Sequence, residues 1–316
     1  MSVTPIFLLS QPRSGSTLAQ RVLASHPQVA TAAEPWVLLP HLYATRERGI
    51  AAEYTQPIAA RAIAEFVQTL PGRDRDYREA LHDFAIDLYT RAAGADVRYF
   101  LDKTPRYHYV VEDLFEVFPD AKTIFLWRNP LAVVASIVQT WSKGRWNVDR
   151  WQGDLRGIAS LVDAYTAHRD TTIALRYEDL VGDPAGSWPT VFDHLGLPFD
   201  GALLTRFSDV RLEGNMGDPT GVHRYSEISA EPLEKWRATL ANPYRKRWCR
   251  AYLRWIGPER LAVMGYELDD LLGQLDRVRA SPRSMASDAV HGGYWALAQR
   301  RKRSAFKRMA PRVRVR

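Results

Sequence analysis

The stretch that decides the fold covers residues 6–24 and reads IFLLSQPRSGSTLAQRVLA. Its first part, Ile6–Leu9, is a short apolar run that predicts a β-strand, and Ser10-Gln11-Pro12 ends that strand. Leu18–Ala24 then carries helix-forming residues, and His26-Pro27 stops them. In a strand–loop–helix unit of this kind, the backbone N–H groups of a Gly-containing loop converge at a helix N-terminus. The stretch therefore predicts an anion-binding loop.

The same alternation of strand and helix continues along the chain. Further strands are predicted at Tyr99–Leu101, Thr123–Trp127 and Thr172–Leu175, and helices at Leu18–Ala24, Tyr109–Phe118, Leu131–Trp141, Trp188–Leu195 and over much of residues 50–93. Strands that alternate with helices indicate a parallel sheet. We therefore expect an α/β protein with a P-loop-type three-layer fold, in which helices cover both faces of a central parallel sheet. Ligands bind such sheets at the carboxyl ends of the strands.

Composition places the chain among globular proteins. It has 316 residues, of which 46% are hydrophobic and 25% are charged, and this favours one main domain over residues 1–280. A single cysteine, Cys249, excludes a disulfide framework. We find no run of 18 apolar residues and no basic region before the first strand, so we predict neither a membrane span nor a signal peptide. A bacterial cytoplasmic location is expected.

The net charge of +7 belongs to the C-terminal end of the chain. Residues 281–316 contain ten Lys and Arg and one Asp, so the remaining body is slightly acidic. A basic surface for nucleic acid is therefore not expected on the body. The stretch 294–316 mixes basic residues with Trp295 and Phe306, which predicts either a solvated appendage or a peripheral contact with an anionic membrane at its inner surface.

The loop itself offers several groups to an anion. Arg13 can donate a charge-assisted fork, and Ser14, Gly15, Ser16, Thr17 and Leu18 supply hydroxyl or backbone donors. The loop lacks the GxxxxGK[ST] spacing of Walker A loops and contains no Lys, which argues against an ATPase or a typical kinase. A capped helix N-terminus without a ligand would look similar, so the loop alone does not define a function.

Three blocks together resemble one known family. They are Gln11–Leu18 followed by Ser25-His26-Pro27, then Asp102-Lys103-Thr104-Pro105, and then Phe125–Pro130 with Ser136 eight residues after Arg128. In order and spacing they resemble the sulfotransferases that use 3′-phosphoadenosine-5′-phosphosulfate (PAPS), in the branch with tyrosylprotein sulfotransferases and bacterial homologues. The resemblance covers residues 5–180.

The resemblance implies where PAPS would bind. The loop would hold the 5′-phosphosulfate, and Arg128 and Ser136 the 3′-phosphate. The physical chemistry agrees for Arg128, because an unpaired charge at the end of a buried strand is costly and an anionic ligand resolves that cost. Tyr177 resembles the family's strand-end Tyr near the nucleotide. Ser226, Lys235 and Trp236 resemble, more loosely, the segment that closes over it.

The resemblance also implies catalytic roles. Sulfuryl transfer needs a base for the acceptor hydroxyl and cations for the sulfuryl and leaving oxygens. Glu34, the one charged residue between Val29 and Leu39, is the candidate general base, expected to lie alone among apolar neighbours. Arg13 and Lys103 are the candidate cations. His108 is a rival base that reads better as structural or substrate-lining.

No metal is expected, because the acidic pairs Asp269-Asp270 and Glu178-Asp179 have no His or Cys at ligand spacing. Two alternatives to a sulfotransferase stay open: a kinase-like phosphoryl transferase on the same scaffold, and a non-catalytic anion- or membrane-binding protein. A sulfotransferase would act on a hydroxyl of a sugar, lipid, peptidyl tyrosine or small metabolite. A helical segment over about 40–95, together with the aromatic residues around Trp141–Trp151, is expected to shape its pocket.

Overall fold

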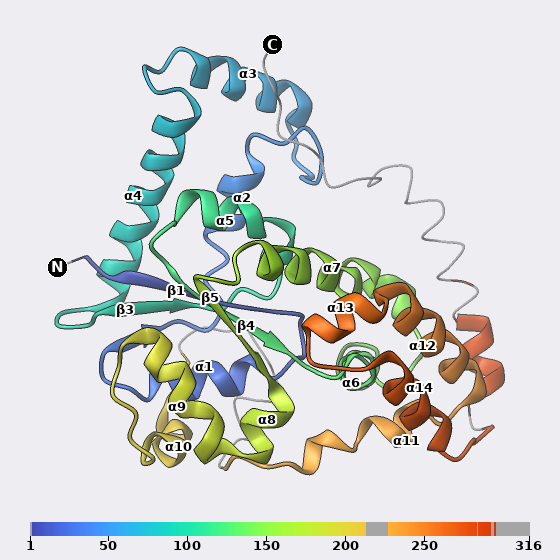
Figure 1. Ribbon diagram of the computed structural model, residues 1–316. Coiled ribbons are helices and arrows are strands. Elements are labelled where there is room, and N and C mark those ends of the chain that lie inside the picture. Colours follow the sequence, from blue (N-terminus) through green and yellow to red (C-terminus); the bar gives the residue numbers. More distant parts are fainter. Residues whose placement is uncertain (1, 213–226, 283, 292–293, 295–316) are drawn as a thin grey trace.

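A computed structural model describes residues 2–212, 227–282, 284–291 and 294 of the chain (Figure 1). Ser226, which the sequence predicts at the nucleotide, lies outside these residues. So does the basic stretch 295–316, including Trp295 and Phe306.

A five-stranded sheet forms the centre of the molecule. Its strands are β1 (Thr4–Ser10), β2 (Val29–Thr31), β3 (Tyr99–Asp102), β4 (Lys122–Trp127) and β5 (Thr172–Arg176). The order is β2-β3-β1-β4-β5, and every neighbouring pair is parallel. The four predicted strands are confirmed. Strand β2 was not predicted, because three residues inside an apolar stretch give too short a pattern to separate from a helix.

Successive side chains of β1 enter two different cores. Ile6 and Leu8 belong to the core on one face of the sheet, and Phe7 and Leu9 to the core on the other. A strand that is buried on both faces reads as a continuous apolar run, which is why no alternation marks this strand in the sequence. The predicted three-layer α/β fold is confirmed.

Helices cover both faces (Figure 1). On the Ile6 face lie α1 (Ser16–Ala24), α8 (Tyr177–Gly182), α9 (Pro184–Leu195) and α10 (Leu203–Arg206). On the Phe7 face the core includes side chains of α2 (Leu38–Tyr43), α4 (Asp74–Ala93), α5 (Val111–Val117), α6 (Pro130–Trp141), α7 (Gln152–Ala167), α11 (Trp236–Leu240), α12 (Pro243–Ile256), α13 (Pro258–Val263) and α14 (Leu268–Arg277). Short 3₁₀ helices are η1 (Tyr107–Tyr109), η2 (Val148–Trp151), η3 (Phe207–Asp209) and η4 (Glu231–Leu233).

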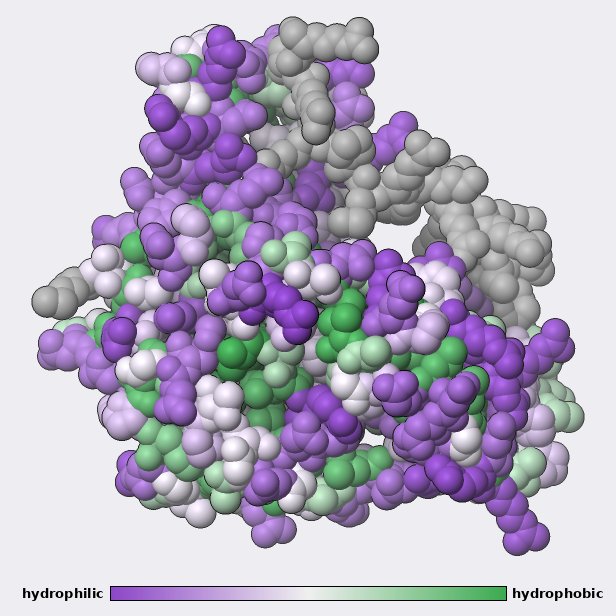
Figure 2. Space-filling view, in the orientation of Figure 1, coloured by the Kyte–Doolittle hydropathy of each residue, from purple (hydrophilic) through white to green (hydrophobic). Residues whose placement is uncertain are grey.

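The predicted helical region over residues 50–93 consists of two helices. These are α3 (Gln56–Gln68) and α4, which project together from the sheet as an arm (Figure 1). On the face shown in Figure 2, apolar residues form small patches among hydrophilic ones. Among the described residues, no helix has both the length and the apolar character needed to cross a membrane.

The start of the C-terminal appendage is bound to the body. Asp288 is buried and accepts hydrogen bonds from Arg245 Nε at 2.7 Å and Asn242 Nδ2 at 2.9 Å. A buried ion pair with additional hydrogen bonds holds this turn of chain against α12. A truncation that aims to remove only the basic stretch must therefore leave Asp288 in place.

Candidate anion-binding and catalytic site

Five predicted site residues follow the five strands, one after each strand. In the spatial order of the sheet they are Glu34 after β2, Lys103 after β3, Arg13 after β1, Arg128 after β4 and Tyr177 after β5. Because the carboxyl ends of parallel strands meet at the same edge, and neighbouring strands lie about 4.8 Å apart, these residues form one row along that edge. The fold therefore brings together residues that are spread over more than half of the sequence.

The loop after β1 takes its shape from two left-handed residues. Arg13 has φ 70° and Gly15 has φ 89°. A Cβ atom on Gly15 would lie 2.2 Å from the ring of Tyr177, so this position requires Gly for both its φ angle and its space. Tyr177 begins α8 and is buried. Its ring forms one wall of the loop, as expected for a strand-end Tyr beside a phosphate-binding loop.

The first turn of α1 carries the other predicted donors. Ser16, Thr17 and Leu18 open the helix, and no acidic residue lies in this turn. Gly15 is the N-cap residue and provides no side-chain cap, so the first N–H groups of the helix keep no such partner. The hydroxyls of Ser16 and Thr17 stand beside them. An N-terminus with these properties suits an anion.

Arg13 is hydrogen-bonded both to Ser136 and to Arg128. Arg13 Nε donates to Ser136 Oγ on α6 at 3.2 Å, and one Arg128 Nη donates to the Arg13 carbonyl at 2.9 Å. The Arg128 guanidinium lies over the Tyr177 ring, 4.4 Å from its centroid.

Arg128 itself keeps an unused donor. Its Nε is buried without a hydrogen-bond partner, and it forms no ion pair with a carboxylate among the described residues. A buried, unsatisfied N–H of a cation is costly, and a phosphate oxygen would relieve that cost. The geometry therefore fits an anionic group between the β4 end and α6.

The turn after β4 is fixed by two neighbouring elements. Asn129 caps α6 by accepting a hydrogen bond from the Leu131 N–H at 2.9 Å. The Asn129 N–H donates to Glu178 at 2.9 Å, and Glu178 also accepts from the Tyr266 hydroxyl at 2.6 Å. These bonds hold the Arg128 backbone in place, and they account for Glu178 as a structural residue.

The part of the chain that the structure describes contains no group of three His, Cys, Asp or Glu that could hold a metal ion.

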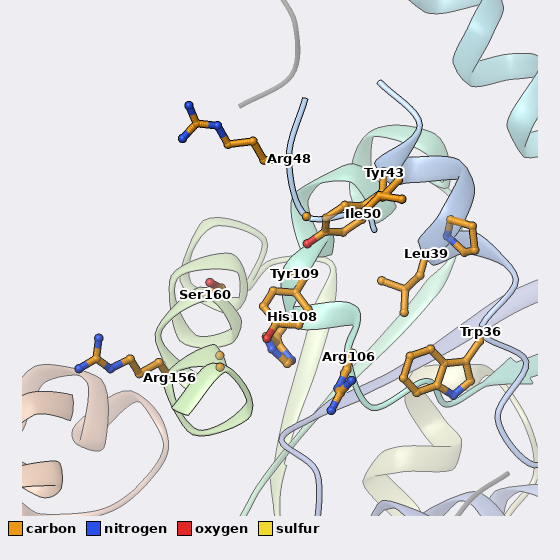
Figure 3. Close-up of a pocket in the computed structure, with 14 residues that line it drawn as sticks. Trp36, Leu39, Tyr43, Arg48, Ile50, Arg106, His108, Tyr109, Arg156 and Ser160 are labelled. Atoms are coloured by element: carbon orange, nitrogen blue, oxygen red, sulfur yellow. The ribbon is translucent and has the colours of Figure 1, made fainter. Parts of the chain in front are cut away.

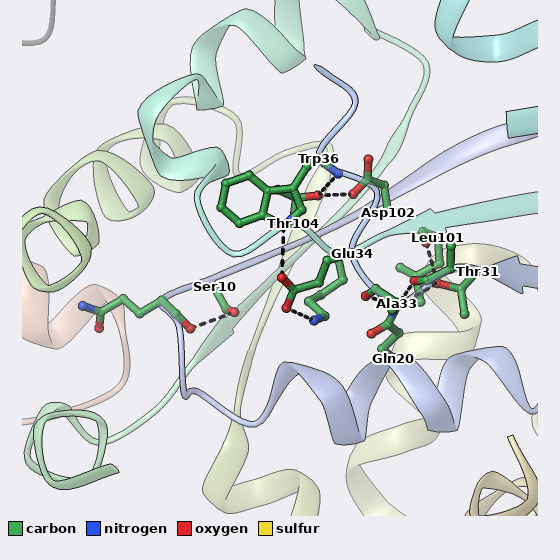
Figure 4. A network of polar contacts seen from close by, with 12 residues as sticks. Ser10, Gln20, Thr31, Ala33, Glu34, Trp36, Leu101, Asp102 and Thr104 are labelled. Carbon is green, nitrogen blue, oxygen red and sulfur yellow. Dashed lines mark hydrogen bonds and ion pairs between the residues drawn. The ribbon is translucent and has the colours of Figure 1, made fainter. Parts of the chain in front are cut away.

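Glu34 and Lys103 form a buried ion pair. Lys103 Nζ lies 2.7 Å from Glu34 Oε1, and the two side chains are 3% and 10% exposed. The Trp36 indole N–H donates to the other Glu34 oxygen at 3.1 Å (Figure 4). The expectation that Glu34 lies alone among apolar neighbours is therefore wrong. One sequence neighbour, Trp36, donates to it, and the end of the parallel strand next to β2 supplies the cation.

A buried network positions this pair. Trp36 has φ 59°, and its backbone N–H donates to Thr104 Oγ1, which in turn donates to Asp102 at 2.8 Å (Figure 4). Asp102 is fully buried and also accepts from the hydroxyls of Tyr89 and Tyr107, each at 2.6 Å. Burial raises the pKa of Asp102, and the three hydrogen bonds oppose that rise.

A second anchor comes from α1. The Gln20 amide donates to the Ala32 carbonyl at 2.6 Å and to the Ala33 carbonyl at 3.2 Å, which are the two residues before Glu34. Sequence reasoning missed these supporting residues, because nothing in their spacing marks them. In the sequence, Asp102 stands out only as the first residue of the motif Asp102-Lys103-Thr104-Pro105, which does not indicate its role in this network.

The segment after residue 226 carries two more of the predicted site residues, Lys235 and Trp236. The Lys235 ammonium is 2.9 Å from Glu231 in an exposed ion pair, with the Lys235 side chain 63% exposed. Trp236 opens α11 and is buried in the core of the Phe7 face. Trp236 lines a small pocket together with Asn129, the residue after Arg128, and α11 packs against α6, the helix that carries Ser136. Of the predicted residues that the structure describes, eleven lie on the phosphate loop, in the strand-end row or on α6: Arg13, Ser14, Gly15, Ser16, Thr17, Leu18, Glu34, Lys103, Arg128, Ser136 and Tyr177.

A cavity of about 900 Å³ opens beside Trp36 (Figure 3). Its lining comes from α2 and the loop after it, from the segment around η1, and from α7: Trp36, Leu39, Pro40, Tyr43, Arg48, Gly49, Ile50, Arg106, His108, Tyr109, Gly153, Arg156, Gly157 and Ser160. The rings of Trp141 and Trp151 contact each other at 4.6 Å between centroids, and neither lines this cavity.

Together the fold and the strand-end row define an α/β protein of the P-loop type with an anion-binding loop. Residues 5–201 match the family model described as "Sulfotransferase family", and the chain belongs to that family. Among curated relatives, it is similar to the nodulation protein NoeE of Sinorhizobium fredii, with 37% identity over 43% of this chain and 31% of the relative. Protein-tyrosine sulfotransferase 1 of Danio rerio is 24% identical over 73% of this chain and 65% of the relative.

A third relative is the omega-hydroxy-beta-dihydromenaquinone-9 sulfotransferase Stf3 of Mycobacterium tuberculosis, 29% identical over 41% of this chain and 36% of the relative. The chain spans about a third of the length of the first relatives that it matches.

Among solved structures, the sulfotransferase domain of the Synechococcus PCC 7002 olefin synthase matches with 28% identity and a TM-score of 0.52, over 75% of this chain and 88% of that domain. The sulfotransferase domain of the curacin biosynthetic pathway matches with 20% identity and a TM-score of 0.55, over 84% and 99%. At 20% identity, the likeness to the curacin domain shows a shared fold.

Proposed function

We propose that this protein transfers a sulfuryl group from PAPS to a hydroxyl acceptor. The observation that carries the proposal is the row along one sheet edge, with Arg128 and Tyr177 on one side of Arg13 and Lys103 and Glu34 on the other. Phosphate-binding groups occupy the β1 and β4 ends of the row, and a carboxylate paired with a cation occupies the β2 and β3 ends. A nucleotide with phosphates at both ends fits such a row, with its reactive end toward Glu34.

The donor would be held by the loop and by α6. The N–H groups at the start of α1, with the hydroxyls of Ser16 and Thr17, would bind the 5′-phosphosulfate. The buried Nε of Arg128 and the hydroxyl of Ser136 would bind the 3′-phosphate. Tyr177 would keep water from the nucleotide side of the loop.

The reaction would run in line. The acceptor oxygen attacks sulfur as Glu34 takes the hydroxyl proton, and the bond between sulfur and the bridging oxygen breaks with its electron pair staying on the 5′-phosphate. Arg13 and Lys103 lie at the two adjacent strand ends, where they would stabilise the charge on the sulfuryl and leaving oxygens. The product is 3′,5′-ADP. No step requires a metal ion.

The hydroxyl class of the acceptor is supported by the names of relatives. One relative is a sulfotransferase of an omega-hydroxy-dihydromenaquinone and another of protein tyrosine. The cavity beside Trp36 is the natural place for the acceptor, because the Trp36 indole both lines the cavity and donates to Glu34.

Ligand stabilisation tests the proposal. A ligand at 100 times its Kd stabilises a folded protein by about 2.7 kcal/mol, so 3′,5′-ADP should raise the Tm, and ATP with Mg²⁺ should not. Transfer of label from [³⁵S]PAPS to a panel of hydroxyl compounds would then measure activity. Stabilisation by ATP with Mg²⁺ and not by 3′,5′-ADP would favour a phosphoryl transferase. Stabilisation by 3′,5′-ADP without any transfer would favour a non-catalytic anion-binding protein.

The basic C-terminal stretch supports a separate proposal about location. Residues 295–316 contain nine Lys and Arg together with Trp295 and Phe306 and would bring a cytoplasmic enzyme to an anionic membrane surface. The test is co-sedimentation with vesicles rich in phosphatidylglycerol, compared with a chain ending at Tyr294. That end point keeps the buried Asp288 in place. Equal sedimentation of the two chains would remove the proposal.

A further inference from the structure

Trp36 is held through its side chain, its backbone and the face of its ring. The indole N–H donates to Glu34 Oε2 at 3.1 Å, and the backbone N–H donates to Thr104 Oγ1 at 3.2 Å (Figure 4). The Arg106 guanidinium lies over the ring, 5.8 Å from its centroid, and both residues line the cavity of about 900 Å³ (Figure 3). Trp36 therefore connects this cavity with the candidate base.

The backbone of Trp36 has an unusual conformation. Its φ of 59° lies in the left-handed region, which is costly for a bulky side chain. The bond to Thr104, which itself donates to the buried Asp102 at 2.8 Å, holds the turn in place. Strain of this kind persists only where the surroundings enforce it, and it is concentrated at functional sites. In this turn the indole reaches back to Glu34, two residues earlier in the chain.

Arg106 restricts the ring from its face. Its Nε and one Nη donate to the two oxygens of Asp154, at 3.0 Å and 3.4 Å, and Asp154 is buried in the first turn of α7. Because the guanidinium is planar and bonds through two of its nitrogens, this pairing sets its orientation. A cation above an indole attracts the ring. The indole of Trp36 is therefore held at its edge by Glu34 and at its face by Arg106.

The two oxygens of Glu34 have different partners. Lys103 Nζ lies 2.7 Å from Oε1, and the Trp36 indole donates to Oε2. The cavity lies on the Oε2 side, because Trp36 lines it and Lys103 does not. An indole N–H only donates, so Trp36 can hold Oε2 but cannot take a proton. An ionised carboxylate oxygen has a second lone-pair site, which leaves Oε2 able to accept from a hydroxyl as well.

We propose that Trp36 is a positioning residue that acts through Glu34. Its indole N–H fixes the plane of the carboxylate, so that the second lone pair of Oε2 points at the hydroxyl of an acceptor in the cavity. The acceptor proton passes to Oε2 as the new oxygen–sulfur bond forms, and the electron pair of the breaking bond stays on the 5′-phosphate. This inference rests on the proposed sulfuryl transfer and adds a residue to its machinery.

A double-mutant cycle on kcat tests the proposal in the full chain with [³⁵S]PAPS. The acceptors are 4-nitrophenol, 2-naphthol, dodecanol and N-acetylglucosamine, and the best of them is used throughout. Trp36→Phe keeps a ring and loses the N–H, so kcat should fall roughly 10- to 100-fold, the worth of one hydrogen bond to a charged group. The acceptor KM should change much less. Made in Glu34→Gln, the same substitution should lower kcat little further, because no base is left to position.

Two further variants separate positioning from general damage. Trp36→His keeps a ring N–H that can donate, so it should recover part of the kcat that Trp36→Phe loses. Trp151→Phe is the matched control, because it removes an indole that donates to Ser142 Oγ at 3.2 Å and does not line the cavity. It should leave kcat nearly unchanged, with Glu34 and with Gln at that position alike.

The bond between indole and carboxylate can be observed without an acceptor. In protein labelled with [¹⁵N]tryptophan, the indole N–H peak of Trp36 is the one that Trp36→Phe or Trp36→His removes from the NMR spectrum. Glu34→Gln should shift this peak more than any other tryptophan peak, and Glu231→Gln, at an exposed carboxylate, should not shift it. A Trp36 peak that stays in place in Glu34→Gln would show that the bond is absent in solution and would remove the proposal.

The kinetic outcomes distinguish this inference from the proposed function. Equal proportional losses of kcat from Trp36→Phe, with Glu34 and with Gln at that position, would mean that Trp36 does not act through Glu34. The inference would then be wrong while the transfer of label leaves the proposed function standing. Calorimetry gives the Kd of 3′,5′-ADP for each protein. Binding of 3′,5′-ADP without transfer to any of the four acceptors would remove both proposals, as would absence of 3′,5′-ADP binding.

Discussion

Glu34 Oε1 and Lys103 Nζ are 2.7 Å apart in a pair of side chains that are nearly inaccessible to water. Removing one partner of a buried pair leaves the other charge uncompensated and costs about 3–5 kcal/mol. We expect Lys103→Met to lower the free energy of unfolding by about this amount, and the double variant Glu34→Gln, Lys103→Met to be more stable than Lys103→Met alone. Urea denaturation of the three proteins measures both differences. A single variant as stable as the original chain would contradict this account of the pair.

Glu34→Gln should separate chemistry from donor binding. An amide cannot accept the acceptor proton, so we expect kcat to fall roughly 10²- to 10⁴-fold, the usual size of general-base catalysis. The Kd for 3′,5′-ADP should stay within about threefold, because the donor contacts lie at the other strand ends. Steady-state kinetics and calorimetry measure these quantities. Glu231→Gln, which changes an exposed carboxylate, is the control, and full turnover by Glu34→Gln would remove Glu34 as the base.

Arg128→Ala should abolish recognition of the 3′-phosphate. The unchanged protein should bind 3′,5′-ADP more tightly than 5′-AMP by roughly 10- to 100-fold, the worth of charge-assisted hydrogen bonds. In Arg128→Ala the two Kd values should become nearly equal. Arg98→Ala removes a guanidinium that also lies over a Tyr ring, at the other end of the sheet, and should preserve the preference. An undiminished preference in Arg128→Ala would place the 3′-phosphate elsewhere.

Gly15→Ala should disturb the phosphate loop in two ways, through backbone strain and through a steric clash. A non-Gly residue at φ 89° is strained by about 1–3 kcal/mol, and the new Cβ would meet the Tyr177 ring. We expect a lower Tm and a Kd for 3′,5′-ADP raised at least about tenfold. Gly182→Ala is the matched control, because a Cβ there meets nothing within 4 Å. Thermal unfolding and calorimetry of both variants decide whether the requirement for glycine is local to the loop.

The buried imidazole of His108 predicts a pH dependence of stability. Burial lowers its pKa to about 4 from an ordinary value of 6.5, so between these values the unfolded chain binds a proton that the folded chain does not. The free energy of unfolding should therefore fall as the pH drops from 6.5 to 4, by roughly 2–3 kcal/mol from this group. His108→Phe should reduce the difference in stability between pH 7.5 and pH 4.5 by that amount. Two urea titrations per protein measure it, and parallel curves for both proteins would contradict the assignment.

The order of strand, loop and helix was predictable because each of the four longer strands is an apolar run with a break after it. The three residues of β2 were not, since a strand of that length has no periodicity of its own. β2 pairs with β3, and α2, α3 and α4 lie between these two strands in the sequence, so no local pattern indicates the pairing.

The site residues themselves were largely visible in the sequence, and their environment was not. Glu34 has apolar neighbours in the chain, yet its partners in space are Lys103 and Trp36, from the next strand end and from a left-handed turn. The cavity beside Trp36 depends on segments far apart in sequence, since its lining comes from residues 36–50, 106–109 and 153–160. Local patterns cannot reveal such contacts.

Strand β1 divides the row of site residues into two independent halves. Arg128 and Tyr177 follow the strands on one side of it, and Glu34 and Lys103 follow those on the other. Most of the cavity lining lies between residues 36 and 109, in the segments after β2 and β3. Residues 36–50, which supply half of that lining, contain none of the proposed donor-binding residues, so an exchange of this stretch by recombination would alter the cavity and keep the donor site. A chimera that receives residues 36–50 from another family member should carry that member's acceptor preference with it.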